Sequence, residues 1–262
     1  MAGPPFHLVD LMGVSFASVT ESRCVEVILE ALGRGGAGWT LTSNLDILRQ
    51  IRWDPKVRHA CGGASMIVAD GFPLILASRL KGDPLPERVA GSNLIRSLSE
   101  GAAREGKSVF LLGGAPGAAE AAARVLVERT PALRIAGTHC PPLGFERDER
   151  EVSVIIDRLR SASPDIVYVA LGSPKTEFLI DRLRHQVPGV WWMGVGISFS
   201  FLAGQVRRAP RWMQRGGLEW VHRLSQEPRR LMRRYLLQGI PFALALLSWA
   251  LYRRFRPGLR GE

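Results

Sequence analysis

One carboxylate stands where α/β proteins often carry out chemistry. Residues 66–69 (MIVA) form a short apolar run typical of a buried strand, and Asp70-Gly71 ends that run. Pro73 suits the first turn of a following helix, where its missing N–H would have no partner. Asp70 is therefore expected at the carboxyl end of a strand, the edge at which open α/β sheets bind ligands. Alternatively, Asp70 only caps the helix or shapes the turn.

Several other predicted strands end in glycines or polar residues that would meet Asp70 at the same edge. Glycines let backbone N–H groups approach a phosphate closely, and the N-termini of the following helices favour negative charge. The strand ends concerned are Thr42–Asn44, Gly113–Gly114, Gly172–Lys175 and Gly194–Gly196. Lys175 is a candidate phosphate contact, although a solvated lysine at a helix start explains it equally well. Together these segments predict an anion-binding cleft that contains a carboxylate.

The motifs of several other chemistries are missing from the chain. Residues 113–117 (GGAPG) do not spell the dinucleotide fingerprint G-x-G-x-x-G, and no G-x-x-x-x-G-K-[ST] phosphate loop is present. There is no G-x-S-x-G nucleophile elbow, no Asp-x-Asp, and no His/Cys/Asp cluster with metal-ligand spacing. A carboxylate base remains, with arginines available to neutralise a leaving diphosphate. This combination suits transfer of a group from a nucleotide-activated donor to a hydroxyl, without a cofactor or a metal.

The net charge and the cysteine content indicate which ligands and which cellular compartment to expect. The 262 residues carry a formal net charge of +11, which favours anionic ligands such as nucleotide phosphates, nucleic acid or an acidic membrane surface. Cys24, Cys61 and Cys140 are odd in number and far apart, as expected in a reducing compartment. The first ten residues lack a basic segment followed by an apolar core, so no secretory signal is predicted.

Apolar runs alternate with helical patterns along the first two hundred residues. Strands are predicted at 39–42, 66–69, 108–112, 134–137, 165–171 and 190–195, and helices at 20–32, 73–80 and 152–159. Further helices are predicted after a cap at Ser43 or Asn44, after a cap at Ser92, and in the alanine-rich segment that follows Gly117. This alternation predicts a Rossmann-like parallel sheet with helices on both faces.

The chain changes character at Arg207. Residues 235–252 carry no charge, and three further arginines, Arg253, Arg254 and Arg256, follow them. We therefore expect three parts: an α/β catalytic domain at 1–206, an arginine-rich helical appendage at 207–234, and an apolar membrane-associating tail at 235–262. The appendage holds nine arginines: Arg207, Arg208, Arg211, Arg215, Arg223, Arg229, Arg230, Arg233 and Arg234.

A series of short motifs resembles the WecG/TagA/CpsF family of bacterial glycosyltransferases. The likeness runs from about Val9 to Tyr235, with the motifs in the family's order. They are Thr42-Ser43-Asn44, residues 68–73 (VADGFP), 87–91 (ERVAG), 110–114 (FLLGG), 171–177 (LGSPKTE), 194–196 (GVG), 208–210 (RAP), 217–220 (GLEW), Arg223-Leu224, 227–230 (EPRR) and 233–235 (RRY).

This resemblance implies an inverting, metal-independent transfer of a sugar from a UDP-sugar to a polyprenyl-diphosphate-linked saccharide. It places the work at the cytoplasmic face of the plasma membrane, in cell-surface or exopolysaccharide synthesis. Asp70 matches the family's proposed base, and arginines of a C-terminal appendage are thought to close over the donor diphosphate. If one helix carried Arg223, Arg230 and Arg233, all three would share a face. The expected substrate-binding residues are Thr42, Asn44, Gly71, Arg88, Gly113, Gly114, Gly172, Pro174, Lys175, Glu177, Gly196, Arg223, Arg230 and Arg233.

The chain departs from the family pattern at three positions. Thr176 stands where the family usually has Gln, and Ser200 and Asn93 each replace a common Asp. These departures bear on the identity of the donor sugar more than on the reaction.

Other functions remain open at this point. A nucleotide-dependent oxidoreductase would need the missing dinucleotide fingerprint, and a non-enzymatic membrane-tethered module would use the tail as its main function. A nucleic-acid binder is disfavoured because aromatic residues are not interleaved with the arginines. Homo-oligomer formation is also left open.

The tail itself is expected to lie on the membrane. Eighteen uncharged residues reach roughly 27 Å, just short of a ~30 Å hydrocarbon core. Pro241 is expected to kink a helix there, and arginines flank both ends of the segment. An interfacial or re-entrant helix is favoured over a spanning one, and packing on the protein's own core is the less favoured alternative.

Overall fold

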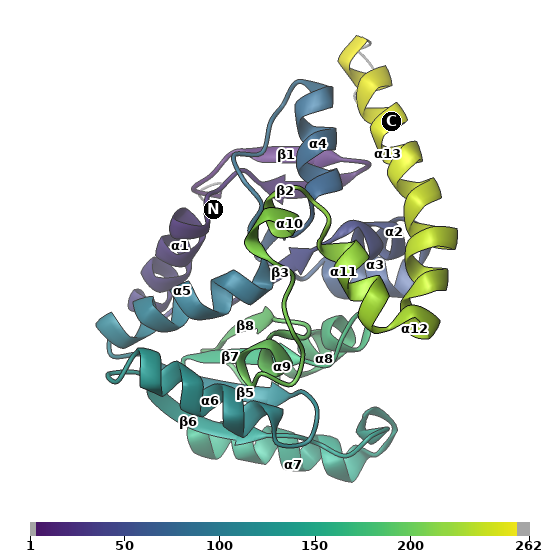
Figure 1. Cartoon of the computed structure of the whole chain (residues 1–262). Coiled ribbons are helices and arrows are strands. Elements are labelled where there is room, and N and C mark those ends of the chain that lie inside the picture. Colours follow the sequence, from purple (N-terminus) through teal and green to yellow (C-terminus); the bar gives the residue numbers. More distant parts are fainter. Residues whose placement is uncertain (1–3, 256–262) are drawn as a thin grey trace.

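A six-stranded parallel sheet forms the centre of the molecule (Figure 1). The computed structural model describes residues 4–255, apart from the side chains of residues 211, 215 and 230, so Arg256 and the end of the tail lie outside it. The strand order is β4-β3-β8-β7-β5-β6, and every neighbouring pair is parallel. The bounds are β3 (Gly38–Ser43), β4 (Met66–Ala69), β5 (Ser108–Gly113), β6 (Arg134–His139), β7 (Ile166–Ala170) and β8 (Trp191–Gly194).

Helices cover both faces of this sheet, as the alternating pattern predicted. Strands β5, β7 and β8 are buried along their whole length, which explains why they are continuous apolar runs. One face packs against α1 (Glu21–Gly33), α5 (Gly91–Arg104), α6 (Ala118–Arg129) and α9 (Ser198–Leu202). The other packs against α2 (Leu45–Trp53), α3 (Pro55–Cys61), α4 (Phe72–Lys81), α7 (Glu149–Ala162) and α8 (Lys175–Leu183).

An antiparallel hairpin of β1 (Leu8–Leu11) and β2 (Val14–Ala17) precedes the sheet and was not predicted. Met12 and Gly13 form its two-residue turn with φ values of 54° and 86°. Such turns usually contain Asn-Gly or Asp-Gly, because left-handed backbone is costly for most side chains. A methionine therefore concealed the turn, and the Gly13 N–H instead donates to Asp10 Oδ2 at 2.9 Å.

The start of α5 differs from the prediction that Ser92 caps it. The helix begins at Gly91, and no local side chain caps it. A Cβ at Gly91 would lie 3.1 Å from Thr42 Oγ1 and 3.4 Å from the Gly194 carbonyl oxygen, so the backbone there lies tightly against the ends of β3 and β8. The Gly91 N–H donates to Asp70 Oδ2 at 3.3 Å, so a distant carboxylate takes the role expected of Ser92.

The C-terminal segment returns across the carboxyl edge of the sheet through several short helices. They are α10 (Arg211–Arg215), α11 (Glu219–Gln226), α12 (Pro228–Met232) and a π-helical stretch, η2 (Arg233–Gly239), which continues into α13 (Ile240–Phe255). Arg223 lies on α11 and Arg230 on α12, so the single helix on which Arg223, Arg230 and Arg233 would share a face does not form. Glu227 has φ −133° and ψ 61°, so the chain turns between α11 and α12, and Pro228 starts the second helix.

Helix α13 packs with one face on the helices that cover the sheet (Figure 1). Phe242, Leu246 and Ala250 are buried against α4 and α2, and the Phe242 ring meets Trp53 edge-on with centroids 5.0 Å apart. This face of α13 therefore packs on the protein's own core, which was the less favoured of the two expectations for the tail. Pro241 stands two residues after the π-helical stretch ends at Gly239, and prolines and π-helical turns are both positions at which helices bend.

The stretch Arg233–Phe255 is also long and apolar enough to cross a membrane, by length and composition alone. Only 17% of its most apolar window is buried inside the protein. Its outward-facing apolar side chains can therefore contact an apolar surface outside the protein.

Truncation of a buried side chain on α13 tests whether the helix is docked in solution. Leu246→Ala should lower the free energy of unfolding by about 2–5 kcal/mol, because it removes buried methyl groups between α13 and α4. Leu251→Ala, on the exposed face of the same helix, should stay within about 0.5 kcal/mol of wild type. Urea unfolding measures both, and equal effects of the two substitutions would show that α13 is not docked.

Candidate active site

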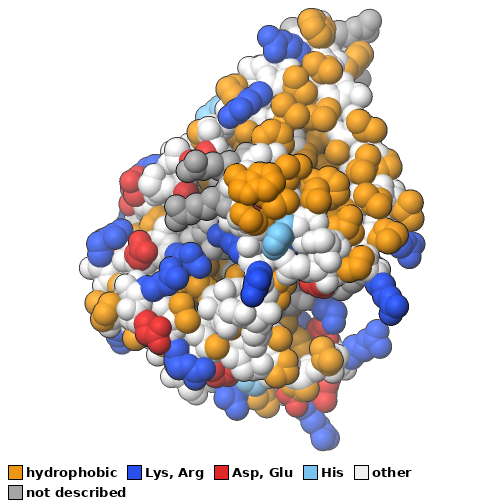
Figure 2. Space-filling view, viewed as in Figure 1, with side chains coloured by type: hydrophobic (Ala, Val, Ile, Leu, Met, Phe, Trp, Pro, Cys, Tyr) orange, Lys and Arg blue, Asp and Glu red, His pale blue; other side chains and the backbone are white. Residues whose placement is uncertain are grey.

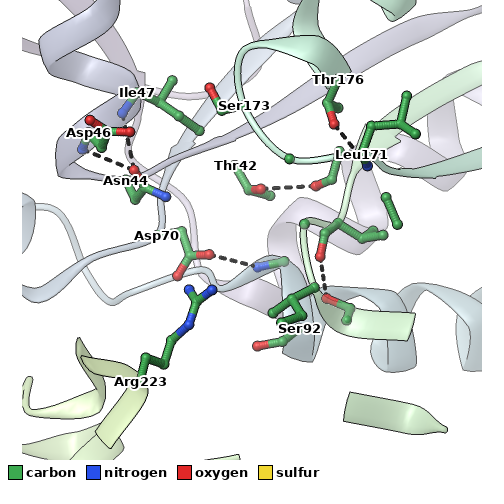
Figure 3. A pocket seen from close by; sticks show the side chains of 18 of the residues that line it. Thr42, Asn44, Asp46, Ile47, Asp70, Ser92, Leu171, Ser173, Thr176 and Arg223 are labelled. Carbon is green, nitrogen blue, oxygen red and sulfur yellow. Dashed lines mark hydrogen bonds between the residues drawn. The ribbon is translucent and has the colours of Figure 1, made fainter. Parts of the chain in front are cut away.

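A cavity of about 700 Å³ lies at the carboxyl edge of the sheet, beneath the C-terminal segment. The ends of β3, β4, β7 and β8 line its floor, as the strand-end pattern predicted. Helix α11, the η2 stretch and the start of α13 supply the other wall. Residues far apart in the sequence thus face one another across the cavity (Figure 3).

Asp70 lies on the floor of this cavity, directly after β4 (Figure 3). Burial raises the pKa of its carboxyl above the ordinary value of 3.8. The guanidinium of Arg88 and the N–H of Gly91 oppose that rise, whereas the carboxylate of Glu219 adds to it. Asp70 is therefore a carboxylate that binds protons more readily than usual, as suits a general base.

An ion pair connects the surroundings of Asp70 to the C-terminal segment. Arg88 Nη1 donates to Glu219 Oε2 at 2.9 Å, and both side chains are about four-fifths buried. On the other side of Glu219, Arg208 Nε lies 3.7 Å from Oε1. Negative and positive groups thus alternate from Asp70 through Arg88 and Glu219 to Arg208.

Thr42 and Asn44 lie beside Asp70, as expected of strand ends that meet at one edge of the sheet. The Thr42 hydroxyl donates to the Gly194 carbonyl at 3.0 Å, which joins the ends of β3 and β8. Asn44 Oδ1 accepts the N–H groups of Asp46 and Ile47 at 3.0 and 3.1 Å and so caps α2. The Asn44 amide nitrogen makes neither of these bonds and points to the side on which Asp70 lies (Figure 3).

Sequence reasoning missed a second ion pair among the residues that line the cavity. Arg234 Nε lies 2.9 Å from Asp46 Oδ2, and Arg49 and Gln50 donate to the same carboxylate. Glu177 lies close by and is buried, and burial raises the pKa of its carboxyl, while Ser173 and Arg234 oppose the rise. No local motif marks Asp46 and Arg234 as partners, because they are 188 positions apart.

Lys175 lines the cavity, but its ammonium group pairs with Glu146. This contact lowers the pKa of the Glu146 carboxyl. Glu146 belongs to a short 3-10 helix, Phe145–Arg147, between β6 and α7. A phosphate at Lys175 would therefore have to share the lysine with Glu146.

The remaining predicted residues divide into those that line the cavity and those that do not. Gly71, Gly114, Gly172, Gly196 and Arg223 line it, and the Arg223 guanidinium points toward Asp70 (Figure 3). Gly113 and Pro174 do not line the cavity. Instead, they shape the backbone at the ends of two neighbouring segments. A Cβ at Gly113 would lie 2.9 Å from the Ala170 carbonyl oxygen, and Pro174 precedes α8.

The predicted arginines of the appendage do not all reach the cavity in this structure. Arg233 is exposed and does not line it, whereas the adjacent Arg234 does. The side chain of Arg230 is not described. Among the described residues, no group of three or more His, Cys, Asp or Glu side chains could hold a metal ion.

Comparison with known proteins gives a family and named relatives. The model of the glycosyl transferase WecG/TagA/CpsF family matches residues 9–256. A relative from Bacillus spizizenii, an N-acetylglucosaminyldiphosphoundecaprenol N-acetyl-beta-D-mannosaminyltransferase, is 34% identical over 77% of this chain and 76% of its own length. A protein of the same name from Bacillus subtilis is 33% identical over 71% of this chain and 69% of its own.

The raised pKa of Asp70 predicts a gain in stability when its charge is removed. A folded-state pKa above the unfolded value means that ionised Asp70 destabilises the fold; this penalty is absent below the unfolded pKa and complete above the folded one. Asp70→Asn should therefore unfold at higher urea concentration than wild type at pH 8. The difference should shrink as the pH falls toward 3.8, and a difference independent of pH would contradict the assignment.

Proposed function

Because this chain belongs to the WecG/TagA/CpsF family of glycosyltransferases, we propose that it transfers a sugar from a UDP-sugar to a polyprenyl-diphosphate-linked saccharide. The observation that carries the proposal is the position of Asp70, on the floor of a cavity whose opposite wall supplies arginines. A carboxylate and cations on facing sides suit a reaction in which a hydroxyl loses a proton while a diphosphate leaves.

The chemistry proceeds in one step in this proposal. The acceptor hydroxyl oxygen attacks the anomeric carbon from the face opposite UDP, and its proton passes to Asp70. The bond between the anomeric carbon and the phosphate oxygen breaks, and its electron pair leaves with UDP. Attack opposite the leaving group inverts the anomeric configuration.

Asp70 must be ionised to accept the proton, and its neighbours determine how readily its carboxyl ionises. Arg88 and the Gly91 N–H favour the carboxylate, whereas burial and Glu219 strengthen its affinity for a proton. A general base works best when its pKa is near the working pH. These opposing effects on the pKa therefore keep Asp70 ionised while raising its affinity for a proton.

The leaving diphosphate needs neutralising groups that act where its charge develops. Arg223 and Arg234 line the cavity from the C-terminal segment, and the backbone at Gly114 and Gly172 lines it from the sheet edge. We propose that these groups replace a metal ion, with Arg230 and Arg233 contributing if the segment moves onto the bound donor. Such donors act most strongly in a site from which water is excluded.

The donor and acceptor are proposed from the relatives. Both relatives are named for the transfer of N-acetylmannosamine to N-acetylglucosaminyldiphosphoundecaprenol. We propose an acceptor of the same chemistry and a hexose or N-acetylhexosamine donor, with the product used in cell-surface or exopolysaccharide synthesis. Thr176, which stands where the family usually has Gln, lines the cavity, and its hydroxyl accepts the Leu171 N–H at 3.3 Å while its own O–H remains able to donate.

We also propose that the protein works at the cytoplasmic face of the plasma membrane, as a peripheral protein. Residues 1–206 would form the catalytic domain, 207–234 the appendage and 235–262 the membrane-associating tail. Exposed apolar side chains gather along α13 (Figure 2), and Arg253 and Arg254 follow them near its end. One face of α13 is buried on the domain, which supports a helix lying on the membrane rather than one crossing it.

Replacement of the proposed base tests the assignment. Asp70→Asn should lower kcat about 10²- to 10⁴-fold while the affinity for the UDP-sugar stays near wild type, because the amide keeps the size but cannot take the proton. UDP release with a lipid-diphosphate acceptor, assayed in EDTA, measures the rate and also tests metal independence. Asp54→Asn, at the start of α3, is the matched control, since asparagine caps a helix as well as aspartate. Wild-type-like turnover by Asp70→Asn would refute the base.

Two adjacent arginines offer a matched test of the diphosphate site. Arg234→Met should lower kcat/KM at least tenfold, because it removes a cation from the cavity and leaves Asp46 without that partner. Arg233→Met should have a smaller effect if the closed arrangement resembles the one seen here. A larger loss at Arg233 than at Arg234 would show that the C-terminal segment rearranges when the donor binds.

A further inference from the structure

The mouth of the cavity is apolar, although its floor is polar. Four large side chains line the mouth and remain partly exposed: Phe72 (42%), Trp220 (38%), Ile240 (45%) and Leu244 (61%). We call these four residues the apolar rim. Exposed apolar side chains that gather on one surface normally mark a binding site for another apolar group.

The rim is built from three separate segments that hold one another in place. Phe72, at the start of α4, lies against the backbone of Gly217, where an added Cβ would come within 2.7 Å of its ring. Trp220 of α11 meets Tyr235 edge-on, with ring centroids 6.2 Å apart. Ile240 and Leu244 lie one turn apart on α13. The rim is therefore a formed surface of the folded protein.

The rim continues into a stripe along α13. Leu251 and Phe255 follow Ile240 and Leu244 at spacings that keep all four on one side of the helix, roughly opposite the buried Phe242 and Leu246. Figure 2 shows hydrophobic side chains along this helix from the middle of the molecule to its tip. An apolar track thus leads away from the cavity along the outer face of α13.

Cationic and apolar groups meet at the inner end of this track. Arg223 and Arg234, proposed above to neutralise the donor diphosphate, line the same cavity as the rim, and Asp70 lies on the floor beyond them. An anionic group of the second substrate would share these cations with the donor. A molecule that fits has an apolar chain, then an anionic group, then a hydroxyl-bearing head that reaches Asp70. This order of groups is that of a prenyl diphosphate saccharide.

We propose that Phe72, Trp220, Ile240 and Leu244 bind the first isoprene units of the lipid-linked acceptor, and that the outer stripe of α13 guides the rest of the chain to the membrane. This assignment rests on the proposed function for the identity of the occupant. It goes beyond membrane attachment, because it gives the rim a direct contact with the substrate. The rim then contributes to affinity for the chain in proportion to the apolar surface that it removes from water.

Binding of farnesyl diphosphate, compared with inorganic diphosphate, tests the rim without relying on turnover. By calorimetry with the full-length protein, farnesyl diphosphate should bind at least tenfold more tightly. Leu244→Gln should remove most of that difference and leave the affinity for inorganic diphosphate unchanged. Leu251→Gln is the matched control: it has the same chemistry on the same stripe but lies outside the cavity, so it should keep the preference. Both positions are exposed, so neither substitution should unfold the protein.

Two results would overturn the proposal. Equal affinities of the wild type for the two probes would mean that the rim binds no chain. Equal losses in Leu244→Gln and Leu251→Gln would mean that the whole stripe is a general apolar contact. Failure of the proposed function would look different: farnesyl diphosphate would bind at the rim, yet no sugar would pass from any UDP-sugar to a lipid-diphosphate acceptor.

Discussion

The ion pair between Arg88 and Glu219 joins the two halves of the candidate active site. Arg88 belongs to the loop before α5 and acts on Asp70, whereas Glu219 begins α11 in the C-terminal segment. Helix α11 buries none of its own residues fully, and its ring contact between Trp220 and Tyr235 is partly exposed, so apolar packing fixes its position less firmly than that of α13. Loss of Glu219 would leave Arg88 as a partly buried cation without this partner, and loss of Arg88 would leave Glu219 with Arg208 alone. The place of α11 over the cavity therefore depends on this contact more than on any apolar one along the helix.

Apolar packing supplies the second attachment of the C-terminal segment. Helix α13 buries Phe242, Leu246 and Ala250 on α4 and α2, and Arg234 pairs with Asp46 just before that helix begins. Polar contacts thus hold α11 and the η2 stretch beside the cavity, and a buried stripe holds α13 along the domain. The opposite face of α13 is exposed, and it is the face that we propose contacts lipid. One helix can serve both purposes because its two faces point in opposite directions.

Much of this architecture could be predicted from the sequence, because strands buried on both faces are continuous apolar runs. Asp70 was located by such a run and by the Gly71-Phe72-Pro73 that follows it. The hairpin turn at Met12 was missed because a left-handed methionine carries no sequence signal. The cap expected from Ser92 was wrong because the capping carboxylate, Asp70, comes from another strand.

The predictions were weakest where a contact joins distant segments. The pairing of Asp46 with Arg234 depends on how the C-terminal segment folds back, which no local pattern records. The tail was equally ambiguous, since residues 235–252 are uncharged and no periodicity in charge shows which face is buried. The break at Pro228 could have been found from the proline, and it separates arginines that one helix would have aligned.

A double-mutant cycle across Arg88 and Glu219 tests most directly whether the strand-end carboxylate and the C-terminal segment form one catalytic unit. The variants Arg88→Met, Glu219→Gln and the double variant would be compared in kcat/KM for sugar transfer. If the pair acts as a unit, the second substitution should cost much less after the first, with a coupling energy of about 1–3 kcal/mol. Additive effects, with a coupling energy near zero, would contradict the account and would leave the C-terminal segment as a cover without a catalytic role.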